Sequence, residues 1–369
     1  MRLDEGGGGG LVLPSAHHEK YAAYHYVKAI ELLNTHIVAR GWLAVDISLL
    51  CCILCVSYEW LRGSYSDAQT HLINGLRVLR QWGRDRAPGS DATTSRSLSA
   101  GSEHFIRNTL IPVYTRYALQ AKTSEAALPW DSSMLPGSQA VPVDSLKAAR
   151  DSFNNMLAQI YLMPHAPSVQ KPEARQRSGV STLVSQWHDR YTAFLSTASL
   201  DTQSLPHIRL LDAAYTVNRI MLLENPTDDQ MLYDAFTPSF ANVVSYAETF
   251  INSSAPTPSF SVDIAIIPVL YLVSLRCRDP RIRRRAIALN QSVARREGVW
   301  DSGVAARVAE EVVSIEEEGV GEVREAGDVG VEKRVGRLWF EADLGGRRMR
   351  LRFERVGEGS WSAERLLVW

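Results

Sequence analysis

Apolar residues recur every three or four positions through most of the chain, which is the spacing of amphipathic helices. A first helix is predicted over residues 18–38, and Gly41 is expected to end it. Its apolar positions are Tyr21, Tyr24, Val27, Ile30, Leu33 and Ile37. Residues 43–61 form the longest apolar run, interrupted by Asp46. They predict a second helix, packed on several sides because it is apolar nearly all round.

The junction after the second helix has the spacing of a helical hairpin. Gly63 is expected to break the second helix, and a third helix is predicted over residues 66–82. Small residues at such positions let two helices approach closely, while an aromatic residue fills the gap between them. One such unit indicates an α-hairpin, whereas a repeat array needs at least three. The positions that carry the spacing are Gly63, Tyr65, Ala68, Leu72 and Gly75.

Helical patterns continue to residue 318. Asp144 is a predicted helix cap, and Asp279-Pro280 is expected to open a later helix because proline suits a first turn. Pro268 is expected either to kink its helix or to mark its true start. The further helices are predicted at about 105–122, 144–163, 183–195, 206–223, 230–251, 262–277, 280–296 and 302–318.

The last 35 residues change to short alternating runs, at 337–340 and 348–353, with Gly345 and Gly346 between them. This pattern predicts a small β-hairpin or meander. The fold class expected is therefore mostly α: a multi-helix domain of packed α-hairpins with a small C-terminal β element. The expected organisation is a flexible glycine-rich tail (1–15), a helical domain (16–334) with mobile loops at about 84–103 and 164–180, and a short β appendage (335–369).

Composition excludes several classes of protein. The 369 residues are 45% hydrophobic and carry a formal net charge of −1, which excludes a disordered chain and one that coats nucleic acid along its length. Four cysteines are too few for a disulfide-dense secreted scaffold. No secretory signal is expected near the start, and no apolar run is long enough to span a membrane.

Catalytic and cofactor motifs are absent, so we expect no enzyme and no cofactor or metal in this chain. Cys51, Cys52 and Cys55 share one helix face, but their apolar neighbours favour the core over zinc, and no paired ligand lies nearby. His17, His18 and His25 are too widely spaced for a ligand pair. A less favoured alternative is an unrecognised active site at the helix junction, around Trp60, Arg62, Tyr65 and His71.

The sharpest chemical feature is an arginine-rich segment, in which residues 271–300 hold eight arginines and two acids. One interpretation is a nuclear import signal or an anion-binding patch. The other, favoured, interpretation is that these arginines pair with residues 301–335, which hold ten acids and four basic residues. The eight candidates are Arg276, Arg278, Arg281, Arg283, Arg284, Arg285, Arg295 and Arg296.

Three stretches resemble the fungal-specific transcription factor family, in its regulatory region C-terminal to the binuclear zinc cluster. The first holds HYVKAIELLN and residues 49–82, the second is residues 260–289, and the third is residues 295–319. The most specific parts are RDPRIRRRA and RREGVWDS. The resemblance implies an all-α regulatory or dimerising domain, a nuclear location and control of transcription.

The six-cysteine cluster that holds two zinc ions in that family has no counterpart here. Zinc is therefore expected only if an N-terminal cluster is missing from this sequence, and no direct DNA binding is expected from this chain alone. Either the sequence lacks its first part or the regulatory domain stands alone. Protein partners or a homodimer are the expected contacts, with no membrane. The alternative is a cytoplasmic helical scaffold or interaction module without a direct role in transcription.

Overall fold

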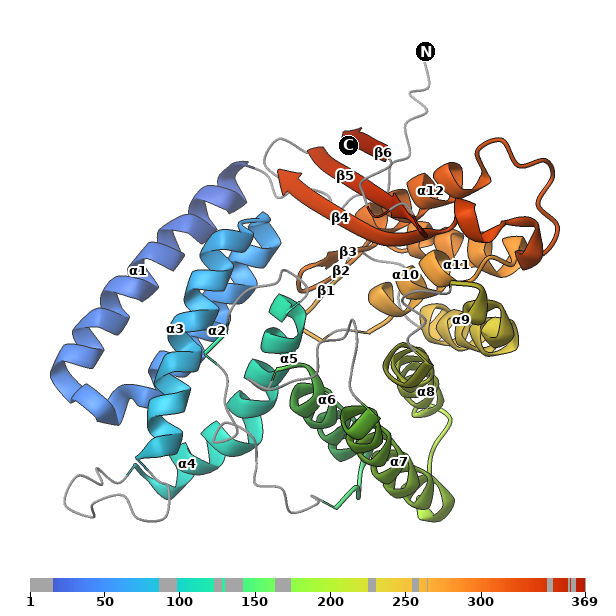
Figure 1. The fold of residues 1–369 in the computed structure, drawn as a ribbon. Helices are drawn as coiled ribbons and strands as arrows, with labels where there is room; N and C mark the ends of the chain where they lie inside the picture. The colour runs from blue at the N-terminus through green and yellow to red at the C-terminus, as the bar shows by residue number, and fades with distance from the viewer. Residues whose placement is uncertain are drawn as a thin grey trace. The chain divides into compact units, whose positions relative to one another are not determined.

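Helices dominate the described part of the chain, so the predicted mostly-α fold class is confirmed (Figure 1). The computed structural model describes residues 16–85, 98–122, 128–129, 142–162, 174–224, 230–253, 259–263, 265–343, 348–357, 359 and 363–368. The chain forms two compact units, an N-terminal unit (Val12–Ala198) and a C-terminal unit (Ser199–Trp369). Among the described residues, no helix combines the length and apolarity needed to cross a membrane.

The N-terminal unit is built of helices. They are α1 (Ala16–Arg40), the 3₁₀ turn η1 (Gly41–Ala44), α2 (Val45–Arg62), α3 (Tyr65–Arg84), α4 (Ala100–Phe105), the π-helical turn η2 (Ile106–Leu110), α5 (Ile111–Ala121), α6 (Leu146–Tyr161) and α7 (Ala174–Thr197). The predicted α2–α3 hairpin is present. Gly63 ends α2 in the left-handed conformation, with φ 78°, and its N–H bonds to the carbonyl of Trp60 at 3.0 Å.

Several predicted boundaries in this unit are corrected. Ser145 rather than Asp144 caps α6, because its hydroxyl accepts the N–H of Ala148 at 3.2 Å. Helix α7 includes residues 174–180, and α4 begins at Ala100, so parts of both expected loops are helical. The remaining loop residues 86–97 and 163–173 lie outside the described residues, as does the predicted tail 1–15.

The predicted apolar face of α1 is only partly the packed one. The half-buried residues of this stripe are Ala22, Tyr26, Ile30 and Leu33, whereas Tyr21, Tyr24 and Val27 are exposed. The packed stripe still has helical spacing, because it recurs at three or four residues. Ile30 and Leu33 belong to the predicted stripe, whereas Ala22 and Tyr26 do not, because alanine is only weakly apolar and the prediction took Tyr21 and Tyr24 instead.

The C-terminal unit combines helices with two small sheets. Its helices are α8 (Leu205–Arg219), the π-helical turn η5 (Ile220–Glu224), the 3₁₀ turn η6 (Gln230–Phe236), α9 (Thr237–Ser253), α10 (Ile267–Arg276), α11 (Pro280–Ser292), α12 (Ser302–Glu317) and the short 3₁₀ turns η7 (Ala326–Asp328) and η8 (Val331–Lys333). Pro268 marks the start of α10, as one of the two predicted alternatives had it. Helix α11 starts at Pro280 as predicted, and Asp279 caps it, since its Oδ1 accepts the N–H groups of Arg281 and Ile282 at 3.0 and 3.1 Å.

A first sheet joins residues that are distant in sequence. Strand β1 (Ser259–Ser261) pairs in parallel with β2 (Arg295–Glu297), which pairs antiparallel with β3 (Trp300–Asp301). The helix predicted over 280–296 therefore ends at Ser292. The pairing with β1 gives the following residues a long-range backbone partner that local periodicity does not reveal.

The predicted C-terminal meander is confirmed, with the order β4 (Val335–Asp343), β5 (Arg348–Arg355) and β6 (Ala363–Val368), all antiparallel. Its inner face places Met349, Leu351 and Phe353 in the core formed by α8–α12. The sheet thus shares the core of the C-terminal unit, although the sequence pattern describes it as an appendage.

Candidate functional site

The arginine-rich segment is organised around one buried carboxylate, that of Glu316 on α12. Arg278 Nη2 lies 2.7 Å from Glu316 Oε1, and Arg283 Nη2 lies 2.6 Å from Oε2. The N–H of Val335, at the start of β4, donates to the same carboxylate at 2.7 Å. Burial alone raises the pKa of Glu316, but the charges of Arg283 and Arg278 outweigh it and hold that pKa at about 2. The ionised carboxylate of Glu316 on α12 therefore binds both Arg283 of α11 and the first N–H of β4, which links these three elements.

A second buried pair lies beside the first. The guanidinium of Arg334 is fully buried and forms two parallel hydrogen bonds with Asp234, at 2.8 and 2.7 Å. It also donates to the carbonyls of Gln230, Val329 and Ala326, each at 2.9 Å. The sequence pattern does not reveal Arg334, because in the sequence a buried arginine just before a strand looks the same as a solvent-exposed one.

Glu297 caps the N-terminus of α10. Its carboxylate accepts the backbone N–H groups of Ala265, Ile266 and Ile267 at 2.9, 3.1 and 3.1 Å. Arg295 Nε lies 2.6 Å from the same carboxylate. A negative charge at a helix N-terminus is favourable, and here it also fastens β2 to α10.

Of the eight arginines singled out in the sequence, only Arg281, Arg284 and Arg285 are exposed. Arg284 pairs with Glu317 on α12 at 2.7 Å, and Arg285 pairs with Glu248 on α9. The other five are partly or fully buried: Arg276, Arg278, Arg283, Arg295 and Arg296. The favoured interpretation was pairing with the acidic stretch, and four of the arginines are paired in this way. They are Arg278, Arg283, Arg284 and Arg296, of which Arg296 lies 3.1 Å from Asp301. An import signal or anion patch stays a prediction for the exposed three.

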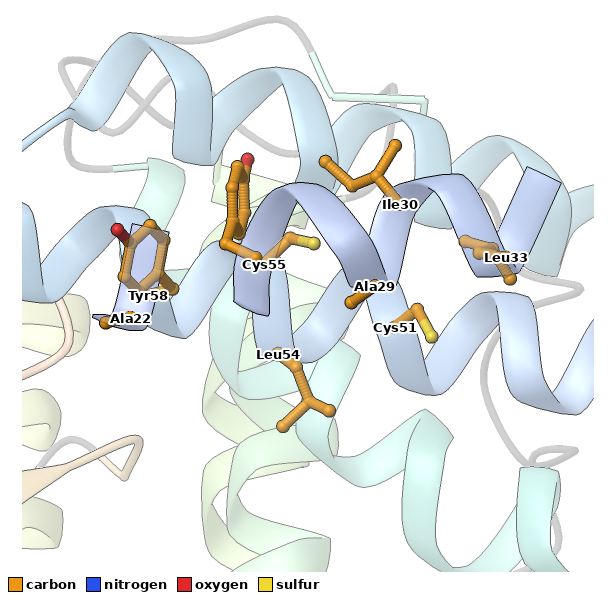
Figure 2. A pocket seen from close by; sticks show the side chains of 9 residues that line it. Ala22, Ala29, Ile30, Leu33, Cys51, Leu54, Cys55 and Tyr58 are labelled. Carbon is orange, nitrogen blue, oxygen red and sulfur yellow. The ribbon is translucent and has the colours of Figure 1, made fainter. Parts of the chain in front are cut away.

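An apolar groove of about 190 Å³ lies between α1 and α2 of the N-terminal unit (Figure 2). The lining residues come from both helices: Ala22, Tyr26, Ala29, Ile30, Leu33, Cys51, Leu54, Cys55 and Tyr58. The groove offers little for polar recognition, and its volume is below that of ordinary small-molecule pockets, which hold about 300–1,000 Å³. Its form suits contact with apolar side chains better than binding of a polar metabolite.

The three cysteines of α2 are free, and two of them, Cys51 and Cys55, line this groove. Burial raises the pKa of Cys52 to about 11 and that of Cys55 to about 12, so both are thiols at neutral pH. Among the described residues, no group of three histidine, cysteine or carboxylate side chains is arranged to hold a metal ion.

The residues of the alternative active site contact several different neighbours. Trp60 is buried on α2 with its ring 4.5 Å from that of Tyr117 on α5, whereas Arg62 lies over Tyr58 within α2. His71 of α3 shares a 2.6 Å hydrogen bond with the hydroxyl of Tyr26 on α1. This last bond fastens α1 to the α2–α3 hairpin, and an active site here stays a prediction.

Comparison with known proteins relates part of the chain to a transcription regulator. A stretch of 62 residues, 17% of this chain, is 40% identical to the aspercryptin biosynthesis cluster-specific transcription regulator atnN of Emericella nidulans. That stretch covers 10% of the length of the Emericella nidulans protein. No protein-family model matches the chain, and no solved structure matches it. The similarity therefore supports a relation to a fungal transcription regulator without establishing the family.

Proposed function

We propose that this chain is a transcription regulator that acts through protein contacts rather than through its own DNA contact. The single observation that carries the proposal is the 40% identity over 62 residues with a transcription regulator. The resemblance of three stretches of the sequence to the regulatory region of fungal zinc-cluster factors supports it. In this proposal the protein is nuclear, is not an enzyme and needs no cofactor of its own.

A reporter assay tests the proposal directly. The full chain is fused to a heterologous DNA-binding domain and placed upstream of a reporter gene in a fungal host. We expect the fusion to change reporter output several-fold relative to the DNA-binding domain alone, in whichever direction the regulator acts. The Glu316→Gln fusion is expected to lose the effect because its core is disrupted, whereas Glu317→Gln should retain it. A folded, nuclear fusion without any effect on the reporter contradicts the proposal.

The arginine-rich helix supplies a separate test of nuclear import. We expect a fluorescently tagged chain to accumulate in the nucleus, and the triple variant Arg281→Ala, Arg284→Ala and Arg285→Ala to lose most of that accumulation. These side chains are exposed, so their loss should leave the fold intact. The matched control removes three other exposed arginines, Arg324, Arg348 and Arg350. Equal localisation of both triple variants would exclude α11 as the import signal.

A second candidate function is a cytoplasmic helical scaffold, and the surface of the N-terminal unit favours it. Large apolar side chains are exposed on α1 and α2, including Tyr21 (62%), Val38 (87%) and Leu54 (59%). Contiguous exposed apolar surface is typical of protein interaction sites. Exclusively cytoplasmic fluorescence of the tagged chain, with no reporter effect, would favour this function over the first.

A further inference from the structure

Strand β4 forms one edge of the C-terminal sheet, whose strand order is β4-β5-β6 (Figure 1). At the start of β4, Arg276 Nη1 donates to the carbonyls of Val335 and Gly336, at 3.3 and 3.5 Å. From Arg337 to Asp343, the strand pairing of the described residues involves β5 alone. Among the described residues, the second edge of residues 338–343 therefore has no strand partner, and its backbone groups face the side where another strand could pair.

The side chains along this edge are apolar at the centre and charged on either side. Trp339 is 37% exposed and Phe340 is 50% exposed. Arg337 and Glu341 flank them and are both exposed. Proteins usually protect a free edge with charged residues, a proline, a β-bulge or a covering element, and the register irregularity of β4 lies at its start, between Val335 and Arg337. Here the centre is aromatic, which indicates an edge that is covered in the assembled protein.

The order of residues on β4 is self-complementary. If a second copy pairs antiparallel with its centre at Trp339, Arg337 lies opposite Glu341 and Leu338 lies opposite Phe340. Each pair occurs twice, and Trp339 lies opposite its own counterpart. Directly opposed residues in antiparallel strands interact, and opposite charges are favourable there. Registers centred on Arg337 or on Glu341 would instead oppose like charges.

The other edge of the sheet is less suited to pairing. Strand β6 is engaged by α12: Arg307 Nη1 donates to the carbonyl of Val368 at 3.3 Å. Arg365 of β6 also lies 3.9 Å from Glu311 of the same helix. Pairing of β4 with β6 of another copy would be heterologous, and such contacts give rings or open filaments rather than a two-fold dimer.

We propose that two copies of this chain join through their β4 edges, antiparallel and centred at Trp339, to form one continuous six-stranded sheet with two-fold symmetry. Such an interface is isologous, because each copy contributes the same residues. The proposal rests on the sheet edge and is independent of any role in transcription.

Disulfide trapping tests both the symmetry and the register. A residue on the two-fold axis lies opposite itself, within the Cα separation that a disulfide accepts. In the full chain, Trp339→Cys should give a covalent dimer on mild oxidation, whereas Leu366→Cys on β6, which is 64% exposed, should not. The unmodified chain, with its four natural cysteines, is the background control. Preferential trapping through Leu54→Cys would place the interface on α1 and α2 and overturn the proposal.

Charge exchange provides a second measurement, read by sedimentation equilibrium. We expect Arg337→Glu or Glu341→Arg alone to weaken dimerisation at least several-fold, and the double variant to recover part of that loss. Arg337 also pairs with Glu354 of its own chain, so circular dichroism must show each variant folded. A monomer at all accessible concentrations overturns the proposal. A dimer whose dissociation constant is unchanged by both charge substitutions also overturns it. A continuous series of assemblies larger than the dimer does the same.

Discussion

Gly75 of α3 lies directly against the ring of Tyr114 of α5. A Cβ atom at position 75 would fall 2.6 Å from Tyr114 Cε1, and closer still to the hydroxyl. The ring has little room to move, since its hydroxyl donates to the carbonyl of Leu49 on α2 at 2.9 Å. This glycine, part of the hairpin spacing read from the sequence, is what allows three helices to meet.

Gly75→Ala should therefore destabilise the N-terminal unit although alanine favours helices. The overlap forces Tyr114 out of its hydrogen bond, and overpacking of this kind costs about 1–3 kcal/mol. Urea unfolding followed by circular dichroism measures the loss. The control is Gly179→Ala in α7, where no atom lies within 4 Å of the added methyl group. That variant should be neutral or stabilised by up to about 1 kcal/mol. Equal behaviour of both variants would contradict the close approach.

Glu316→Gln should be among the most destabilising single changes in the C-terminal unit. It leaves Arg278 and Arg283 buried without their counter-charge, and loss of one partner from a buried ion pair costs about 3–5 kcal/mol. Glu317→Gln is the matched control, because its partner Arg284 is half exposed and such pairs contribute less than about 1 kcal/mol. Both free energies of unfolding can be measured by denaturant titration. A loss below 1 kcal/mol in Glu316→Gln would show that Glu316 carries no such pair.

Acid should unfold the C-terminal unit partly through Glu316. The pKa of this carboxyl is about 2 in the folded state and 4.5 ordinarily, so the unfolded state binds the proton first. The stabilisation is thus complete above pH 4.5 and is lost as the pH falls towards 2, amounting to roughly 3 kcal/mol. The pKa values of Asp201 and Asp328 are also lowered, by hydrogen bonds from Ser204 and from the Arg324 N–H respectively. Comparison with Glu316→Gln isolates the part due to Glu316, since the slope in this window should fall in that variant.

The cysteines should react slowly with thiol reagents in the folded protein. Burial raises the pKa of Cys277 to about 11 and that of Cys55 to about 12, and the thiolate is the reactive form. At pH 8 we expect Cys51, the least buried in α2, to react first. Cys277, 1% exposed, should react last. Alkylation followed by mass spectrometry gives the order, with the chain in denaturant as the fully reactive reference. Rapid modification of Cys277 under native conditions would contradict its placement in the core.

Local signals in the sequence determined the fold class, the α2–α3 hairpin, the start of α11 and the C-terminal meander. These features depend on periodicity and on residues such as Gly63 and Pro280, whose backbone preferences act over a few positions. The pairing of the arginine-rich segment with the acidic one could also be predicted, because the charge balance along the chain indicates it.

Only the tertiary structure decided which individual side chains are partners. Arg283 differs from Arg281 and Arg284 in nothing but its position around α11, yet it is buried on Glu316 with Arg278, which precedes the helix, whereas the other two are exposed. Arg334 finds Asp234 a hundred residues away, and β2 takes residues that helical periodicity assigned to α11. Long-range contacts of this kind depend on how faces and edges meet after the elements form. The sequence by itself therefore determined most of the helices and the C-terminal meander. The packing of these elements decided which charged side chains form buried ion pairs.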